Sequence, residues 1–191
     1  MAGLNHALFL LLNAGAQPPA PVVLFAMLAA KVLIALVPLH IALIWFCGSR
    51  VMRFVALMGV LALLAALGVS ALLGLLIHTP RPFLLGLGHT LIDHRPSASF
   101  PSNHATVFFA WTATLAFCRL GRLAITFGGL GLLVAWSRVY LGVHFPLDIA
   151  GAAVVSIFGA ALALQIMLRR GAFILAVAER LAARFGPPSR A

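Results

Sequence analysis

Side chains suited to phosphate chemistry cluster between Ser137 and Asp148, in a segment that reads SRVYLGVHFPLD. This segment holds a guanidinium, an imidazole and a carboxylate in a chain that is 63% hydrophobic and only 8% charged. An ionisable residue at the centre of a membrane-spanning helix costs about 2.5–3.5 kcal/mol, so such residues in an apolar chain usually mark a functional site. We therefore take this segment as the centre of a candidate site.

His144 and Asp148 are suited to act as a pair. Pro146, between them, suits the first position of a helix. Asp148 then falls in the first helical turn, where the helix dipole favours a carboxylate. From there it can hold one ring nitrogen of His144 and leave the other free as a nucleophile or base. A helix cap alone would explain Asp148 but would leave His144 without a role.

A second imidazole follows Pro101, in Ser102-Asn103-His104. Ser102 suits the N-cap of a helix, and the free N–H groups of the first turn can bind an anion. His104 would lie on that turn, beside a bound phosphate, as an acid or base. The alternative is a histidine packed in the core.

Arginines near these segments indicate an anionic ligand. Arg81 and Arg138 stand beside prolines or histidines at expected helix ends, and planar guanidinium groups bind phosphate through paired hydrogen bonds. An arginine can also anchor to lipid headgroups, and for Arg95 both interpretations stay open.

Few groups in the chain could hold a metal ion. Its acidic residues are Asp93, Asp148 and Glu179, and Glu179 is expected at the opposite end from the other two. A carboxylate site for magnesium cannot be assembled from them, so we expect neither a metal nor a cofactor. The seven histidines leave a zinc site open as an alternative.

Five long apolar segments must position these groups. They cover roughly residues 22–47, 54–77, 102–118, 123–139 and 146–168, near the roughly 20 residues that cross a bilayer. Residues 1–20 predict a short interfacial or tilted helix over 4–16 and a proline-rich turn, and 172–191 an amphipathic tail. With a mean hydropathy of +1.13, the pattern predicts an all-α, polytopic transmembrane helix bundle in one domain, 1–191.

The basic residues predict the orientation in the membrane. If consecutive spans alternate in direction, one end carries nine arginines, at positions 50, 53, 119, 122, 169, 170, 180, 184 and 190. The positive-inside rule makes that end cytoplasmic, so the candidate site faces the periplasm or cell exterior. The net charge of +10 comes from residues that punctuate apolar runs, so no nucleic acid is expected. Cys47 and Cys118 are expected to be free thiols.

These segments resemble the three signature motifs of the type 2 phosphatidic acid phosphatase superfamily of membrane lipid phosphatases. The matching residues are Arg81-Pro82, Pro101-Ser102-Asn103-His104, and Ser137-Arg138 with His144 and Asp148 at the motif spacing. The string FPSNHAT at 100–106 is similar to that of the bacterial undecaprenyl-diphosphate phosphatases in particular. The resemblance implies a six-helix core in which residues 4–16 make the first crossing.

The resemblance also implies a metal-independent, two-step reaction. His144, oriented by Asp148, would attack phosphorus to give a phosphohistidine. His104 would protonate the leaving oxygen and then activate water. The substrate-binding residues would be Arg81, Pro82, Arg138, Ser102, Asn103 and His78.

One position departs from the motif. Gly74 stands seven residues before Arg81, where the superfamily normally has a lysine. His78 could replace the lost cation. Lys31 is a second candidate, since side chains lean toward the N-terminus of their helix and could bring its amine to the outer end. Alternatively, Lys31 pairs with backbone carbonyls or lipid.

We expect an inner-membrane phosphatase that converts undecaprenyl diphosphate to undecaprenyl phosphate and phosphate, recycling the lipid carrier of peptidoglycan synthesis. Its partners would be the lipid phosphate and the bilayer; the oligomeric state stays open. Phosphatidylglycerophosphate, phosphatidic acid or a lipid A phosphate would suit the same motifs. An anion carrier is the alternative from another class. It would need ionisable groups through the membrane depth, where only Lys31 and His40 lie.

Overall fold

The apolar segments form helices, and the polar segments between them form turns and one long connection. The computed structural model describes residues 2–184 and contains no β-strand there. Its α-helices are α1 (Ala2–Leu12), α2 (Ala20–Lys31), α3 (Leu36–Cys47), α4 (Arg50–Ile77), α5 (Asn103–Phe117), α6 (Gly121–Tyr140) and α7 (Pro146–Ala182), with 3-10 helices η1 (Leu33–Ala35) and η2 (Pro82–Leu85). The predicted all-α class is confirmed.

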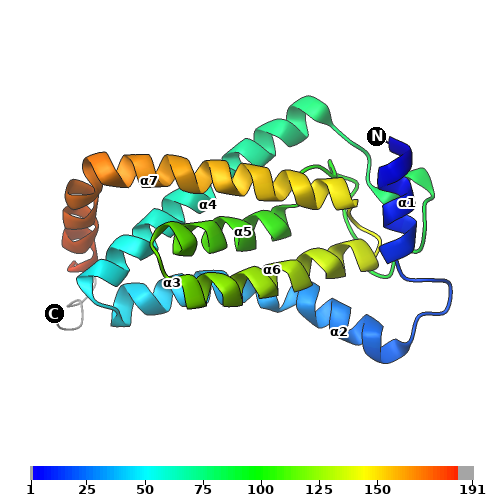
Figure 1. The fold of residues 1–191 in the computed structure, drawn as a ribbon, viewed down its shortest axis with the longest axis horizontal. Coiled ribbons are helices and arrows are strands. Elements are labelled where there is room, and N and C mark those ends of the chain that lie inside the picture. Colours follow the sequence, from blue (N-terminus) through cyan, green and yellow to red (C-terminus); the bar gives the residue numbers. More distant parts are fainter. Residues whose placement is uncertain (1, 185–191) are drawn as a thin grey trace.

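All helices except α1 run along the length of the molecule, whereas α1 lies across one end of the bundle (Figure 1). Counting α2, η1 and α3 as one bent helix gives six helices in residues 2–184, the number that the resemblance implies. Asn13, just after α1, fixes this helix: its side-chain amide donates to the carbonyls of Tyr140 and His89, both at 2.9 Å. The orientation agrees with an interfacial helix rather than a first crossing.

Four helical stretches in residues 2–184 are long and apolar enough to cross a membrane. They are Ala20–Cys47, Arg50–Leu85, Gly121–Tyr140 and Pro146–Ala182. The segment predicted as the third span forms a helix within one residue of the predicted bounds, but its 15 residues, a length of about 22 Å, are too few for it to count among these stretches. It packs against α4, α6 and α7, so its first turn, with Ser102 and His104, is surrounded by the other helices.

The span predicted over 22–47 is present as Ala20–Cys47, but η1 interrupts its α-helix, because Pro38 has no backbone N–H to donate to the preceding turn. One predicted boundary is wrong. Residues 172–182 do not form a separate helix but continue α7, which turns near its C-terminal end (Figure 1). Gly171 lies between the two segments that were predicted to be separate, but a single glycine within a helix need not end it. The rest of the predicted tail, residues 185–191, lies outside the described residues.

Small residues let α4 and α7 pack closely. A Cβ atom added at Gly159 would lie 2.8 Å from the carbonyl oxygen of Ala62 and 2.8 Å from the Cβ of Ala66. Close backbone approach of this kind is how membrane helices gain packing energy. It fixes the start of α7, with His144 and Asp148, beside the end of α4, which leads to Arg81.

The two ends of the bundle differ in chemistry. The long connection over 78–101, the α6–α7 turn and α1 all lie at one end (Figure 1). The α3–α4 and α5–α6 turns and the end of α7 lie at the other. Among the described residues these segments carry the arginines at positions 50, 53, 119, 122, 169, 170, 180 and 184. The polar groups and the arginine-rich turns therefore sit at opposite ends, as the alternating topology predicts.

Candidate active site

His144 and Asp148 form a buried hydrogen-bonded pair at the start of α7. Pro146 is the first residue of this helix, which places Asp148 in its first turn. The Asp148 carboxylate oxygen Oδ2 lies 3.2 Å from His144 Nδ1 and accepts from the Phe145 backbone N–H at 2.8 Å. The Ser99 hydroxyl also donates to Oδ2. These partners, with both side chains at most 3% exposed, fix the carboxylate and the imidazole together, as the sequence predicts.

This arrangement leaves Nε2 of His144 as the reactive ring nitrogen. Nδ1 is the nitrogen that faces the carboxylate and carries the proton, so Nε2 carries the electron pair that can accept a hydrogen bond or attack phosphorus. Burial lowers the pKa of His144 to about 4, and the nearby charges of Arg81 and Arg138 act in the same direction, while Asp148 opposes them. The ring is neutral at pH 7, as a nucleophile must be.

Arg81 links three parts of the site. Its Nε donates to the Ser97 carbonyl at 3.0 Å, and Nη2 to the Ala98 carbonyl at 3.0 Å and the Ser97 hydroxyl at 3.2 Å. Its Nη1 donates to the Val143 carbonyl at 2.8 Å and lies 3.2 Å from Nε2 of His144. The guanidinium, predicted only to bind phosphate, therefore also holds the long connection against the α6–α7 turn.

Arg138 and Ser102 present buried donors without a partner. Nε and Nη2 of Arg138 and Oγ of Ser102 make no hydrogen bond in the part of the chain that is described. Ser102 takes the predicted N-cap position of α5, but its side chain makes no capping bond. Buried polar groups are almost always paired, so these atoms indicate a ligand that accepts hydrogen bonds from several directions, as phosphate does.

A cavity of about 460 Å³ joins the two imidazoles. His104 and His144 both line it, together with Arg81 and the half-buried His94. The structure thus brings together the histidines of two separate helix starts, as the sequence predicts, while the role of each remains a prediction. The cavity also reaches the exposed Leu75 on α4, which gives it an apolar side.

Some of the other predicted binding residues line the cavity and some do not. His78, which ends α4 with a φ of 38°, and Asn103 both line it and are exposed. Pro82 is buried, begins η2 and does not line the cavity, so it positions Arg81 and does not face the ligand. Gly74 lines the cavity, and a Cβ there would lie 3.6 Å from that of Ala98, an ordinary contact.

Three polar residues of the long connection belong to the site, although the sequence assigned none of them a role. Ser99 binds Asp148, Ser97 binds Arg81, and the His94 ring centroid lies 6.4 Å from that of His144. Burial lowers the pKa of His94, and the charges of Arg81 and Arg138 lower it further, whereas the hydrogen bond that its ring donates to the Arg95 carbonyl raises it. The only sequence signal for these residues was the unusual length of a polar connection.

The described residues offer no evident metal site. Within 2–184, no group of three His, Cys, Asp or Glu side chains is placed to hold a metal ion. Metal independence stays a prediction to be tested with a chelator.

Comparisons with known proteins agree with the motif resemblance. Residues 54–172 match the PAP2 superfamily. The protein YbjG of Escherichia coli, proposed to be an undecaprenyl-diphosphatase, is 37% identical over 162 residues, which cover 83% of this chain and 80% of YbjG. Undecaprenyl-diphosphatase BcrC of Bacillus subtilis is 36% identical over 116 residues, 60% of this chain and 58% of BcrC.

Two solved structures share the fold. LpxE of Aquifex aeolicus superposes with a TM-score of 0.67 at 28% identity, over 85% of this chain and 95% of LpxE. A PAP2-type phosphatidylglycerolphosphate phosphatase of Bacillus subtilis superposes with a TM-score of 0.59 at 21% identity, over 87% of this chain and 84% of that protein. Together with the apolar helices and the paired histidines, these matches establish that the chain is a multi-pass membrane protein and belongs to the PAP2 superfamily.

Proposed function

We propose that this protein is a membrane lipid phosphatase, acting as a single domain, that hydrolyses undecaprenyl diphosphate to undecaprenyl phosphate and inorganic phosphate. The observation that carries the proposal is the cavity that the neutral His144 lines together with His104. Arg138, whose Nε and Nη2 have no partner in the described chain, is buried behind this lining, and its charge acts on both rings. The choice of lipid is supported by the names of the relatives YbjG and BcrC.

In the first step, Nε2 of His144 attacks the terminal phosphorus. A P–N bond forms, the P–O bond to the lipid phosphate breaks, and the leaving oxygen takes the electron pair and a proton from the imidazolium form of His104. Burial and the charge of Arg138 lower the pKa of His104 to about 4, and the negative charge of a bound diphosphate raises it again and so favours the imidazolium. The proton on Nδ1 stays with His144, held by Asp148 at 3.2 Å. The negative charge of the carboxylate stabilises the positive charge that develops on the ring.

In the second step, His104 takes a proton from water, which attacks the phosphorus of the phosphohistidine. The P–N bond breaks and its electron pair returns to Nε2 of His144, so that both histidines recover their starting states. Arg138 and Ser102 hold the phosphoryl oxygens throughout and stabilise the charge of the transition state.

Arg81 must change partners during the reaction. Its Nη1 lies 3.2 Å from the nitrogen that attacks, and this contact occupies the electron pair of Nε2. A bound phosphoryl oxygen would attract the guanidinium and free Nε2. The bonds to Ser97 and Ala98 keep Arg81 at the edge of the cavity while this happens.

Phosphate release from purified protein tests the proposal. His144→Ala and His104→Ala should each abolish turnover without loss of the folded state. His89→Ala is the matched control, because its exposed imidazole lies at the same end but does not line the cavity. Near-normal turnover by either of the first two variants would refute the role given to that histidine.

A panel of lipids tests the substrate. The panel would contain undecaprenyl diphosphate, phosphatidylglycerophosphate, phosphatidic acid and a lipid A phosphate, and the first should give the highest kcat/KM. A higher kcat/KM for another lipid would make that lipid the preferred substrate, with the same reaction. The anion carrier is disfavoured, because His40 accepts a hydrogen bond from the indole of Trp111 at 3.2 Å and is thus a packed residue.

We further propose that the protein lies in the bacterial inner membrane with the cavity on the periplasmic or outer face. Cys47 is exposed at the arginine-rich end, and His89 at the opposite end. A membrane-impermeant maleimide applied to intact cells with a permeable outer membrane should label a Cys47→Ser, His89→Cys variant but not Cys47 of the natural chain. The reverse pattern would contradict the proposed orientation.

A further inference from the structure

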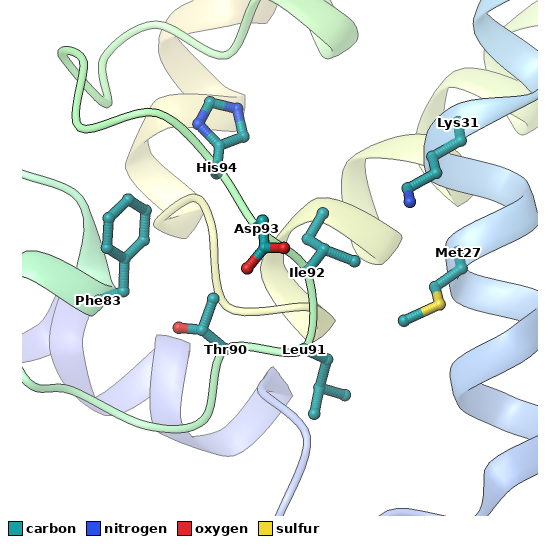
Figure 2. A pocket seen from close by; sticks show the side chains of 8 residues that line it. All are labelled: Met27, Lys31, Phe83, Thr90, Leu91, Ile92, Asp93 and His94. Carbon is teal, nitrogen blue, oxygen red and sulfur yellow. The ribbon is translucent and has the colours of Figure 1, made fainter.

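A second pocket adjoins the catalytic cavity. It has a volume of about 600 Å³ and lies between α2 and the connection over residues 83–94 (Figure 2). Its lining consists of Met27, Lys31, Phe83, Thr90, Leu91, Ile92, Asp93 and His94. Because His94 also lines the cavity that holds His104 and His144, a ligand that fills the cavity can extend past His94 into this pocket.

Lys31 is the cation of this pocket. It is the last residue of α2, and its amine points away from the helix toward Asp93 and His94 (Figure 2). Lys31 makes no ion pair within residues 2–184 and its side chain is exposed.

The surrounding helices hold Lys31 in this place. Ala26 and Ala30 of α2 are buried against Leu141 of the α6–α7 turn, close to the start of the catalytic segment. This packing places the last turn of α2, with Lys31, beside the α6–α7 turn that carries His144.

The charges in the pocket suit one additional phosphate group. Lys31 supplies a positive charge, whereas the Nδ1 of His94 is already bonded to the Arg95 carbonyl at 3.0 Å. Asp93 is exposed and repels an anion, but it forms no ion pair with Lys31 within 4.0 Å among the described residues. The lysine amine is thus available to a ligand.

We propose that this pocket is a second phosphate subsite, in which Lys31 binds the phosphate group of the substrate that is not transferred. The inference rests on the proposed function, because only a diphosphate has such a group. His144 attacks the terminal phosphorus, and Lys31 stabilises the negative charge that the other phosphate gains when the P–O bond breaks. Lys31 thereby makes the enzyme prefer diphosphates over monophosphates.

Kinetics with a matched pair of substrates test the subsite. Farnesyl diphosphate and farnesyl monophosphate differ only in the second phosphate. Lys31→Met removes the charge and keeps an unbranched apolar side chain, and Lys31→Arg keeps the charge. A hydrogen bond to a charged group corresponds to a factor of about 10 to 100, so Lys31→Met should lower kcat/KM for the diphosphate by that factor and for the monophosphate by less than about twofold. Lys31→Arg should recover most of the loss.

Asp93→Asn is the control within the same pocket. Removing its charge should raise kcat/KM for the diphosphate by about fivefold at most and leave the monophosphate unchanged. The subsite is overturned if Lys31→Met lowers kcat/KM equally for both substrates or lowers it for neither. It is also overturned if Asp93→Asn lowers kcat/KM for the diphosphate as much as Lys31→Met does. If the natural chain hydrolyses the monophosphate but not the diphosphate, the proposed substrate is wrong. This outcome is distinct from a failure of the Lys31 subsite, which requires a natural chain that hydrolyses the diphosphate.

Discussion

The substitution Asp148→Asn removes one charge from the centre of the site and leaves its shape unchanged. The carboxylate oxygen Oδ2 receives three donors, from Ser99, Phe145 and His144. The amide oxygen of an asparagine can take the same place and accept from all three. The fold should therefore survive, and thermal unfolding of the variant in detergent should match that of the natural chain within a few degrees.

Catalysis should nevertheless fall strongly. A hydrogen bond to a charged partner contributes about 1.5–3 kcal/mol, a factor of about 10 to 150 in rate. Where an aspartate orients a catalytic histidine in serine proteases, replacement by asparagine lowers kcat by about 10⁴. We expect kcat for phosphate release to fall by a factor between about 10² and 10⁴. KM should change little, because Asp148 does not face the cavity.

The pH dependence provides a second readout with a defined sign. Asp148 raises the pKa of His144 through its hydrogen bond and its charge, against the larger effect of burial, and the resulting pKa is about 4. The neutral ring attacks, so activity of the natural chain should fall below about pH 5. Asp148→Asn removes the contribution that raises the pKa, and the acid limb of kcat/KM should move to lower pH. A variant with kcat within threefold of normal, or an acid limb that moves upward, would refute this reasoning.

The remaining predictions concern donors, backbone and metals. Ser102→Ala should lower kcat/KM about tenfold without lowering Tm, since Ser102 Oγ has no partner in the described chain; an unchanged kcat/KM would remove Ser102 from the site. Gly142→Ala should lower both Tm and activity, because Gly142 has a φ of 82° and a Cβ would lie 2.3 Å from the carbonyl oxygen of His89. Incubation with EDTA should leave phosphate release unchanged, and a loss that a divalent ion restores would favour the zinc alternative.

Local features of the sequence predicted the helix starts at the site. Pro146 and Asp148 suit the first turn of α7, and their spacing from His144 places both side chains in contact. Pro101 and Ser102 likewise marked the start of α5. These predictions concern residues within a few positions of one another, where helical geometry alone determines what can touch.

Contacts between distant segments could not be predicted in the same way. Arg81 meets Ser97 and Val143, and Ser99 meets Asp148, across 16, 62 and 49 residues. The connection over 86–99 has neither helical nor strand periodicity, so its path is determined by these contacts. The orientation of α1 depends similarly on Asn13, whose partners His89 and Tyr140 lie 76 and 127 residues away.

The bounds of α5 were predicted to within one residue, but its place inside the bundle was not. Hydropathy measures how apolar a segment is, and the apolar run over 102–118 satisfies either a membrane span or a buried helix. α5 is enclosed by α4, α6 and α7, with Phe108, Trp111 and Leu115 fully buried. Its residues are apolar because they face protein, and hydropathy alone could not show this.

Direct detection of the phosphorylated intermediate tests the account most closely. The protein would be mixed with diphosphate substrate for a single turnover, quenched in alkali, where phosphohistidine is stable, and mapped by mass spectrometry of its peptides. The phosphate should be found on His144, and His144→Ala should show none. Phosphate on another residue, or full product formation with no phosphorylated protein at any time, would contradict the account.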